Sequence, residues 1–344
     1  MTIFALSTGP GISGLAVIRI SGKECKIIFE KMISGKMPEP RVATLKKINK
    51  INTNEIIDEG LILWFPAPHS YTGEDMIEMH IHGGIAVIKA IQDTLSEIEE
   101  CRLAEPGEFT KLAFLNGKIS LLKAESVSDL ISSETEIQRR QALDVMSGYH
   151  GNKYENWRNE LLKILSNVEA KIDFPDEDLP KDVIHNIKVV SSKVKNEIKK
   201  ILDDQKVGER IREGFKIAII GPTNAGKSSL LNYFSQRDVA IVSEIAGTTR
   251  DVVEAHLNVD GYPVIMSDTA GIRDAKDDIE KRGIRLALKK AEDADLNIVI
   301  IEAKNGYFTG VLKGLVNSEK TILVINKSDL NLKTDFDEFK NLNP

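Results

Sequence analysis

The chain has few cysteines and lacks any long apolar run. Cys25 and Cys101 are the two cysteines among its 344 residues, so one disulfide is possible by count. No apolar stretch approaches the length of a membrane-spanning helix. The first residues, Met-Thr-Ile-Phe, carry neither the basic segment nor the small-residue cleavage site of a secretory signal. We therefore expect a cytoplasmic protein with no membrane association, where a disulfide is not expected.

An excess of positive charge is also absent. The net charge is −6, whereas nucleic-acid-binding domains commonly have a broad basic surface. Any contact with RNA must therefore be local, or lie on a partner protein. Short basic clusters occur at Arg139-Arg140, at Lys199-Lys200 and across residues 206–212. Each is more simply explained as a solvated helix face.

A complete set of metal ligands is not evident either. His80 and His82 would project to one face if they lie on a strand, because side chains alternate along a strand. A zinc site needs further ligands, and no nearby cysteine or suitable group of carboxylates supplies them. We therefore favour His82 as part of a turn flanked by glycines.

What the sequence does contain is a phosphate-binding loop. Its eight residues, Gly221-Pro-Thr-Asn-Ala-Gly226-Lys227-Ser228, follow the apolar segment 215–220 and precede the amphipathic segment 229–234. This order predicts a buried strand, a loop and a helix, whose backbone N–H groups and dipole attract phosphate. Lys227 would then reach the β- and γ-phosphates, and the hydroxyl of Ser228 would bind Mg²⁺.

Three later segments identify the nucleotide as GTP. Asp268-Thr-Ala-Gly271 ends an apolar strand and places a carboxylate beside Mg²⁺. Asn326-Lys327-Ser328-Asp329 ends another, and its aspartate can accept two hydrogen bonds from guanine, a donor pair that adenine lacks. Gly247-Thr248-Thr249-Arg250-Asp251 offers Thr249 as a second hydroxyl for Mg²⁺. Together the four segments predict a GTPase.

Two departures from small signalling GTPases bear on the mechanism. Ile272 stands where a glutamine would orient the attacking water, so another group must do so, and the acidic residues 274–280 are the nearest source. Asn224, with backbone carbonyls of residues 243–248, could hold a monovalent cation that neutralises developing charge. The alternative is that Asn224 only shapes the turn.

Further motifs extend along the chain outside the nucleotide segments. They are Ala16-Val-Ile-Arg19-Ile-Ser-Gly22, Ser70-Tyr-Thr-Gly-Glu74-Asp75, His82-Gly-Gly84, Glu105-Pro-Gly-Glu-Phe109, Phe114-Leu-Asn-Gly-Lys118 and Asp173-Phe-Pro-Asp-Glu177. Taken with the nucleotide segments, they resemble the MnmE family, also called TrmE, of tRNA modification GTPases.

This resemblance implies a multidomain fold. An α+β domain at residues 1–118 would bind tetrahydrofolate and dimerise. Residues 119–212 would form the first half of an α-helical central domain. Residues 213–344 would form an α/β P-loop GTPase domain that is incomplete at its C-terminus.

The resemblance also implies roles for individual residues. Arg19, Glu78 and Lys118 would contact the folate, and Glu280, which would fill the role left open at Ile272, would position the hydrolytic water through a bridge. The implied ligands of K⁺ are Asn224 and the backbone at Ser243, Ile245 and Thr248, and those of Mg²⁺ are Ser228 and Thr249. The implied GTP-binding residues are Asn224, Ala225, Gly226, Lys227, Ser228, Ser229, Ser243, Glu244, Ile245, Ala246, Gly247, Thr248, Thr249, Asp268, Thr269, Ala270, Gly271, Asn326, Lys327 and Asp329.

The implied function is K⁺-stimulated hydrolysis of GTP to GDP and phosphate. In the resembling family this hydrolysis is coupled to carboxymethylaminomethyl-type modification at C5 of the wobble uridine, U34, of certain tRNAs. The one-carbon unit would come from 5-formyl- or 5,10-methylene-tetrahydrofolate. The implied partners are a second copy in a homodimer, tRNA, and the FAD-carrying protein MnmG in a heterotetramer.

The family's pattern continues past the guanine segment, whereas this chain stops at Pro344. We therefore expect a truncated or split product, with the apolar stripes of helices at 155–172 and 183–202 left without partner helices. One alternative is a folate-binding, dimerising remnant without useful turnover. Another is a ribosome-assembly GTPase, which would share the nucleotide segments but would not need Arg19, Glu78 and Lys118.

Overall fold

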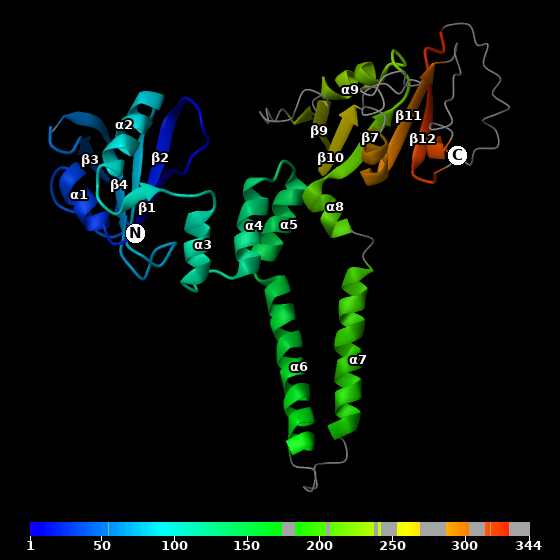
Figure 1. Cartoon of the computed structure of the whole chain (residues 1–344), viewed down its shortest axis with the longest axis horizontal. Helices are drawn as coiled ribbons and strands as arrows, with labels where there is room; N and C mark the ends of the chain where they lie inside the picture. Colours follow the sequence, from blue (N-terminus) through cyan, green and yellow to red (C-terminus); the bar gives the residue numbers. More distant parts are fainter. Residues whose placement is uncertain are drawn as a thin grey trace. The chain divides into compact units, whose positions relative to one another are not determined.

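The computed structural model describes residues 1–53, 55–173, 183–203, 207–236, 240–241, 253–268, 287–302, 314–316 and 318–329. The chain forms two compact units, residues 1–125 and 126–344 (Figure 1). α4 (Leu121–Ile131) runs across the boundary between them.

The first unit is built on a six-stranded sheet with the strand order β3-β4-β5-β2-β1-β6. Neighbouring strands are antiparallel except β1 and β6, which are parallel. The strands are β1 (Thr2–Leu6), β2 (Ser13–Ser21), β3 (Thr44–Asn49), β4 (Ile56–Phe65), β5 (Met76–Gly83) and β6 (Cys101–Leu103). The helices are α1 (Cys25–Met32), α2 (Ile85–Ser96) and α3 (Glu108–Leu115).

Alternation along β5 separates a core face of this sheet from a polar face. Ile77, Met79 and Ile81 are buried, whereas Glu78 and His80 point to the opposite face. The buried side chains form one core with apolar residues of α1 and α2. Because the two helices cover one face, the polar side chains of β5 are left on the other.

The second unit contains a long helical pair, α6 (Tyr149–Asp173) and α7 (Val183–Leu202), which run side by side (Figure 1). Trp157 Nε1 donates to Glu197 Oε2 at 2.6 Å across the pair. The helix that the sequence predicts over residues 155–172 begins earlier, at Tyr149. None of the described helices has the length and hydropathy that crossing a membrane requires.

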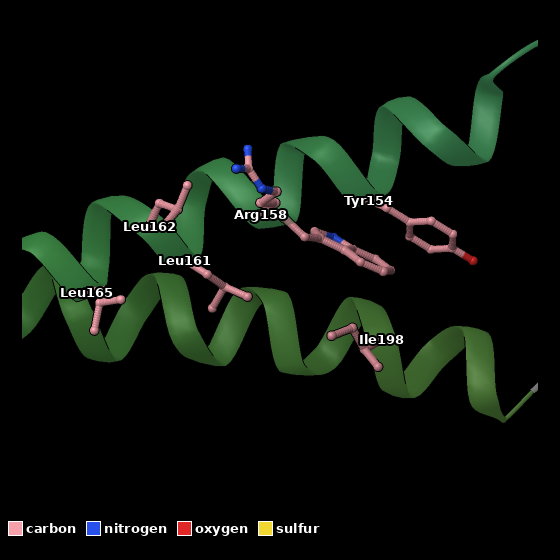
Figure 2. Close-up of a pocket in the computed structure, with 7 residues that line it drawn as sticks. Tyr154, Arg158, Leu161, Leu162, Leu165 and Ile198 are labelled. Atoms are coloured by element: carbon pink, nitrogen blue, oxygen red, sulfur yellow. The ribbon is translucent and has the colours of Figure 1, made fainter. Parts of the chain in front are cut away.

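An open apolar groove of about 400 Å³ lies along this helical pair (Figure 2). It is lined by Tyr154, Trp157, Arg158, Leu161, Leu162, Leu165 and Ile198. The three leucines are exposed whereas Trp157 is buried, so part of the apolar stripe expected on this helix faces solvent among the described residues.

Two shorter helices, α5 (Glu136–Met146) and α8 (Val207–Glu213), pack against each other and against the second sheet. α5 begins with a capping box, in which Thr135 and Gln138 bond reciprocally. The charged stretch after α7 is thus helical in α8.

The second sheet has the order β12-β11-β7-β10-β9-β8. β12, β11, β7 and β10 are mutually parallel, while β9 is antiparallel to β10 and β8. The strands are β7 (Phe215–Ile220), β8 (Ala240–Ile241), β9 (Val253–Val259), β10 (Tyr262–Asp268), β11 (Leu296–Glu302) and β12 (Thr321–Asn326), and α9 (Lys227–Ser235) follows β7. Apolar clusters cover both faces, which is why the central strands are apolar runs.

Parallel strands bring their carboxyl ends to one edge of a sheet, and the predicted nucleotide segments follow β7, β10 and β12 at that edge. The mixed α/β sheets and the intervening helices agree with the predicted fold class. The division at residues 118 and 212 stays a prediction.

Candidate functional site

The loop between β7 and α9 has the backbone that close approach of phosphate requires. Gly226, the N-cap of α9, has a φ of 105°, a left-handed conformation that glycine adopts without strain. A Cβ at this position would overlap the side-chain amide of Asn326. A Cβ at Gly221 would overlap the carbonyl oxygen of Ile300. Both glycines are therefore required by the packing of the loop onto its neighbours.

Lys227, the first residue of α9, folds back over this loop. Its Nζ donates to the carbonyl oxygen of Pro222 at 2.9 Å, and the residue is 7% exposed. Burial lowers the pKa of Lys227, and the negative charge of Asp268 opposes that shift. The ammonium is thus held at the loop by a neutral carbonyl, a contact that phosphate oxygens can replace with stronger ones.

Asp268, the last residue of β10, meets Ser228 beside the loop. Ser228 Oγ donates to Asp268 Oδ2 at 2.6 Å. The other oxygen, Oδ1, is buried and has no hydrogen-bond partner within the described residues. A buried carboxylate oxygen without a partner is costly, and it points to a ligand. Hydroxyl and carboxylate oxygens are the ligands that Mg²⁺ prefers, so these residues fit that ion.

The segment after β12 is attached directly to the phosphate loop. Asn326 Nδ2 donates to the carbonyl oxygen of Ala225 at 2.8 Å, and Asn326 Oδ1 accepts from the backbone N–H of Lys327 at 2.9 Å. Lys327 Nζ lies 3.3 Å from Glu302 Oε1. Asp329 is exposed, so its carboxylate is open to a ligand. Asn326 therefore braces the loop, and the carboxylate of Asp329 is exposed beside it.

Asn224 lies at the tip of the loop with a φ of 65°, which asparagine tolerates better than most residues. Its side chain is exposed and forms no hydrogen bond with the rest of the described chain. Ser229, in the first turn of α9, is also exposed. The remaining predicted nucleotide residues lie outside the described residues: Ser243, Glu244, Ile245, Ala246, Gly247, Thr248, Thr249, Thr269, Ala270, Gly271, Ile272 and Glu280.

A second polar cluster lies on the polar face of the first unit's sheet. Register places Arg19 of β2 directly opposite Glu78 of β5. Arg19 Nε and Nη2 each lie 2.8 Å from Glu78 Oε1. The guanidinium is also 5.6 Å from the ring centroid of Tyr71 and 5.8 Å from that of Phe109. The two rings and the carboxylate fix the position of the arginine.

Lys118 joins this region through the loop that carries Tyr71. The Lys118 side chain lies against Gly73, where a Cβ would come 3.0 Å from Cε of the lysine. Asn116 Nδ2 donates to the carbonyl oxygen of Thr72 at 2.7 Å. Tyr71 and Thr110 share a 3.0 Å hydrogen bond between their hydroxyls. The structure thus connects Arg19, Glu78 and Lys118 through one loop of the same unit.

Two family matches cover nearly all of the chain. Residues 2–118 match the GTP-binding protein TrmE N-terminus, and residues 121–335 match the MnmE helical domain. Among similar proteins, the tRNA modification GTPase MnmE of Pelagibacter ubique is 68% identical over 341 residues, which span 99% of this chain and 77% of that protein. This chain belongs to the MnmE family of tRNA modification GTPases.

More distant MnmE-family members match over a similar extent. The tRNA modification GTPase MnmE of Rickettsia akari is 46% identical over 332 residues, covering 96% of this chain and 74% of that protein. The 5-taurinomethyluridine-[tRNA] synthase subunit GTPB3, mitochondrial, of Danio rerio is 43% identical over 343 residues, covering 96% of this chain and 68% of that protein.

The basic clusters of this MnmE-family chain are largely engaged with acids. Arg139 and Arg140 both pair with Glu136, at 2.7 and 2.8 Å. In α8, Arg210 pairs with Asp295 at 2.8 Å and Arg212 with Asp129 at 2.9 Å. Lys199 and Lys200 are exposed, and Lys206 lies outside the described residues. The assignment of these clusters to solvated helix faces stays a prediction.

His80 and His82 both lie on β5, so His82 belongs to a strand and not to the turn that the sequence favours. His82 Nδ1 lies 2.8 Å from Asp58 Oδ1, and His82 donates its backbone N–H to Asp58 Oδ2 at 2.8 Å. Within the residues described, no group of three or more potential metal ligands is found. His80 lies beside Glu78, a position that sequence reasoning did not assign to a site. Alternation of side chains was the signal that could have placed it there.

Proposed function

We propose that this chain is a GTP hydrolase whose turnover is coupled to the modification of tRNA. The observation that carries the proposal is the convergence of Lys227, the Ser228–Asp268 pair and Asn326 at one edge of a parallel sheet. Membership of a family of tRNA modification GTPases supports the same activity and supplies the substrate. It also favours tRNA modification over ribosome assembly, the alternative that shares the nucleotide segments.

In this mechanism the chain acts mainly by positioning and by electrostatics. Lys227, which is largely buried, would place a positive charge against the β- and γ-phosphates, where burial strengthens charge stabilisation. Ser228 and Thr249 would hold Mg²⁺ with Asp268 nearby, and the ion would neutralise phosphate charge. Asp329 would accept hydrogen bonds from guanine while Asn326 keeps the loop in place.

Water and a monovalent cation complete the proposed hydrolytic site. Glu280 would position the attacking water through a bridge, since Ile272 has no polar atom for that task. K⁺ would be held by Asn224 and the backbone of Ser243, Ile245 and Thr248. The amide of Asn224 supports this proposal, because it is exposed and forms no hydrogen bond with the described residues; the same φ also suits a plain turn.

The first unit would bind 5-formyl- or 5,10-methylene-tetrahydrofolate through Arg19, Glu78 and Lys118, as a source of the one-carbon unit for C5 of U34. The pairing of Arg19 with Glu78 beside two aromatic rings supports this site. Domains at 1–118, 119–212 and 213–344 would carry folate binding with dimerisation, the helical region, and GTP hydrolysis.

A homodimer, tRNA and the flavoprotein MnmG are the proposed partners, and the cytoplasm is the proposed compartment. The name of the Danio rerio relative, a subunit of a tRNA-uridine synthase, supports both a uridine target and a partner subunit. The second candidate function is folate binding and dimerisation without GTP turnover. It would use the same folate-site residues of the first unit as the proposed function does.

GTP turnover by the purified chain tests the proposal. We expect hydrolysis in K⁺ to exceed hydrolysis in Na⁺, and Lys227→Ala to reduce kcat/KM by about a hundred-fold, the usual cost of removing one charge-stabilising group. Lys216→Ala is the matched control, because Lys216 is half exposed on β7 and pairs with Glu213. Absence of GTP binding at millimolar concentration would favour the folate-binding remnant instead.

A further inference from the structure

Glu78 presents its two carboxylate oxygens to different neighbours. Oε1 lies 2.8 Å from two guanidinium nitrogens of Arg19. Oε2 accepts no hydrogen bond from the described residues, and Nε2 of His80 lies 3.6 Å from it. The side chain of Glu78 is 17% exposed, and its Oε2 retains the capacity to accept a hydrogen bond.

His80, like Glu78, has a polar atom without a hydrogen-bond partner among the described residues. Its Nε2 is buried and has no hydrogen-bond partner among the described residues. The imidazole is 26% exposed as a whole, so its ring edge reaches solvent while Nε2 faces the carboxylate. A separation of 3.6 Å is too long for a hydrogen bond, and a small rotation of either side chain would form one.

We propose that His80 is a positioning residue for folate binding: its Nε2–H holds Oε2 of Glu78 and fixes the plane of the carboxylate. This inference rests on the proposed folate site. The terminal torsion of a glutamate is broad, so Arg19 on one oxygen does not by itself set the orientation of the other. Anchors on both oxygens do so.

The chemistry of the ligand explains why the plane matters. The 2-amino-4-oxopyrimidine ring of tetrahydrofolate carries two neighbouring N–H donors that lie in one plane. A carboxylate accepts such a pair in parallel when its own plane is aligned with the ring, as it does with the fork of an arginine. Each oxygen of Glu78 can accept from the ligand in addition to its protein donor.

His82 is a built-in comparison for His80. It lies two residues further along β5 and on the same face, but it pairs with Asp58 and is 73% exposed. Glu78 therefore has one histidine neighbour in ion-pair range, and removal of His82 should leave its carboxylate in place.

Calorimetric titration of the full chain with 5-formyl-tetrahydrofolate tests the proposal. We expect His80→Ala to weaken folate binding by about ten-fold, the loss of one charge-assisted hydrogen bond. His80→Gln keeps an N–H donor at the same reach, and we expect it to restore affinity to within about three-fold of the wild type. His82→Ala should change folate affinity by less than about two-fold, because His82 is exposed and solvent screens any effect of its charge on the folate site. GTP binding, measured on the same samples, should be unchanged.

The outcomes separate this inference from the proposed function. If the wild type binds folate and His80→Ala binds it equally well, the role of His80 is refuted and the folate site stands. Loss of affinity in His80→Ala that His80→Gln does not restore also refutes it, because a donor is then not what matters. If the wild type binds no folate, the proposed site itself fails.

Discussion

Asp268 carries, at the scale of one residue, the geometry on which the proposed Mg²⁺ site rests. Its Oδ2 accepts from Ser228, whereas Oδ1 is buried without a partner in the described chain. A buried acceptor of this kind costs free energy that a ligand can recover. The negative charge of Asp268 also opposes the lowering of the Lys227 pKa by burial, so this carboxylate favours the charged form of Lys227.

Asp268→Asn should therefore separate GTP binding from Mg²⁺. We expect its affinity for GTP in Mg²⁺ to be about ten-fold weaker than that of the wild type, through loss of one charged contact. Addition of EDTA should weaken GTP binding by the wild type and leave GTP binding by the variant nearly unchanged. Fluorescence titration with a labelled nucleotide measures both. Asp260→Asn, in the exposed turn before β10, is the control, and equal EDTA sensitivity in both variants would contradict the role of Asp268.

A second residue-scale prediction concerns pH and the first unit. Glu108 accepts from Nη1 and Nη2 of Arg102 at 2.9 and 2.5 Å, and this pairing lowers the pKa of Glu108 from 4.5 to about 2. A carboxyl whose pKa is depressed by folding stabilises the fold above its ordinary pKa. That contribution is lost as the pH falls from 4.5 towards 2.

Glu108→Gln should lower the free energy of unfolding by about 1 kcal/mol at pH 7, since Arg102 is partly exposed and the pair is screened. The difference should shrink steadily below pH 4.5. Urea unfolding, followed through Trp64 in a Trp157→Phe background, measures it. Glu99→Gln, an exposed acid, should show no such gap. A gap that stays constant down to pH 3 would rule out the ion pair as its cause, because that pH lies well inside the window of the shift.

At the scale of elements, α5 connects the helical region to the nucleotide-binding sheet. Glu134, just before α5, bonds through Oε2 to Nδ1 of His256 in β9 at 2.9 Å. Gln141 Nε2 donates to the carbonyl oxygen of Gly208 in α8 at 3.0 Å. β9 in turn pairs with β10, which ends at Asp268. The strand next to β10, which ends at Asp268, is therefore bonded to the residue just before α5.

Sequence reasoning found the parts of this unit that depend on neighbours in the chain. β7, the glycine loop and α9 were foreseen because an apolar run, glycines and an amphipathic stretch follow one another. The contacts between Asn326 and Ala225, and between Glu134 and His256, were not, because they join residues 101 and 122 positions apart. Such contacts depend on strand order and register, which no local pattern specifies.

In the first unit, too, local patterns predict some features whereas strand pairing decides others. Alternation predicts that His80 and His82 share a face if they lie on a strand, and they do so on β5. What lies beside them is set by the pairing of β2 with β5, which brings Arg19 opposite Glu78. The family resemblance, not the local pattern, supplied those two residues. The family resemblance did not point to His80, because the role proposed for His80 depends on the surroundings of its Nε2 atom.

Gly261→Ala should loosen the contact between α5 and the sheet. Gly261 lies in the turn between β9 and β10 with a φ of 89°, and an added Cβ would come 3.3 Å from Cδ1 of Ile137 in α5. We expect the free energy of unfolding to fall by about 1–2 kcal/mol, from backbone strain and crowding. Urea unfolding followed through Trp157 checks this. Gly314→Ala, in the same unit and with open space around the position, should cost less, and equal costs would contradict the argument.

At the scale of the whole molecule, the two sites lie in units with separate cores. One core joins the first sheet to α1 and α2, and two clusters cover the faces of the second sheet. Trp64 lies in the first core and Trp157 in the α6–α7 pair, so the two tryptophans of the chain report on different units. Ligands of the two sites should therefore stabilise different unfolding transitions.

Thermal unfolding with each ligand tests this division. A non-hydrolysable GTP analogue with Mg²⁺, at a hundred times its Kd, should stabilise the second unit by about 2.7 kcal/mol and raise the Tm seen by Trp157 in a Trp64→Phe background. It should leave the Tm seen by Trp64 in a Trp157→Phe background unchanged, whereas 5-formyl-tetrahydrofolate should do the reverse. Lys227→Ala and His80→Ala should each abolish or reduce only the shift of its own unit. Equal shifts of both signals with either ligand would mean that the units unfold as one, since a ligand stabilises the whole of the cooperative unit to which it binds.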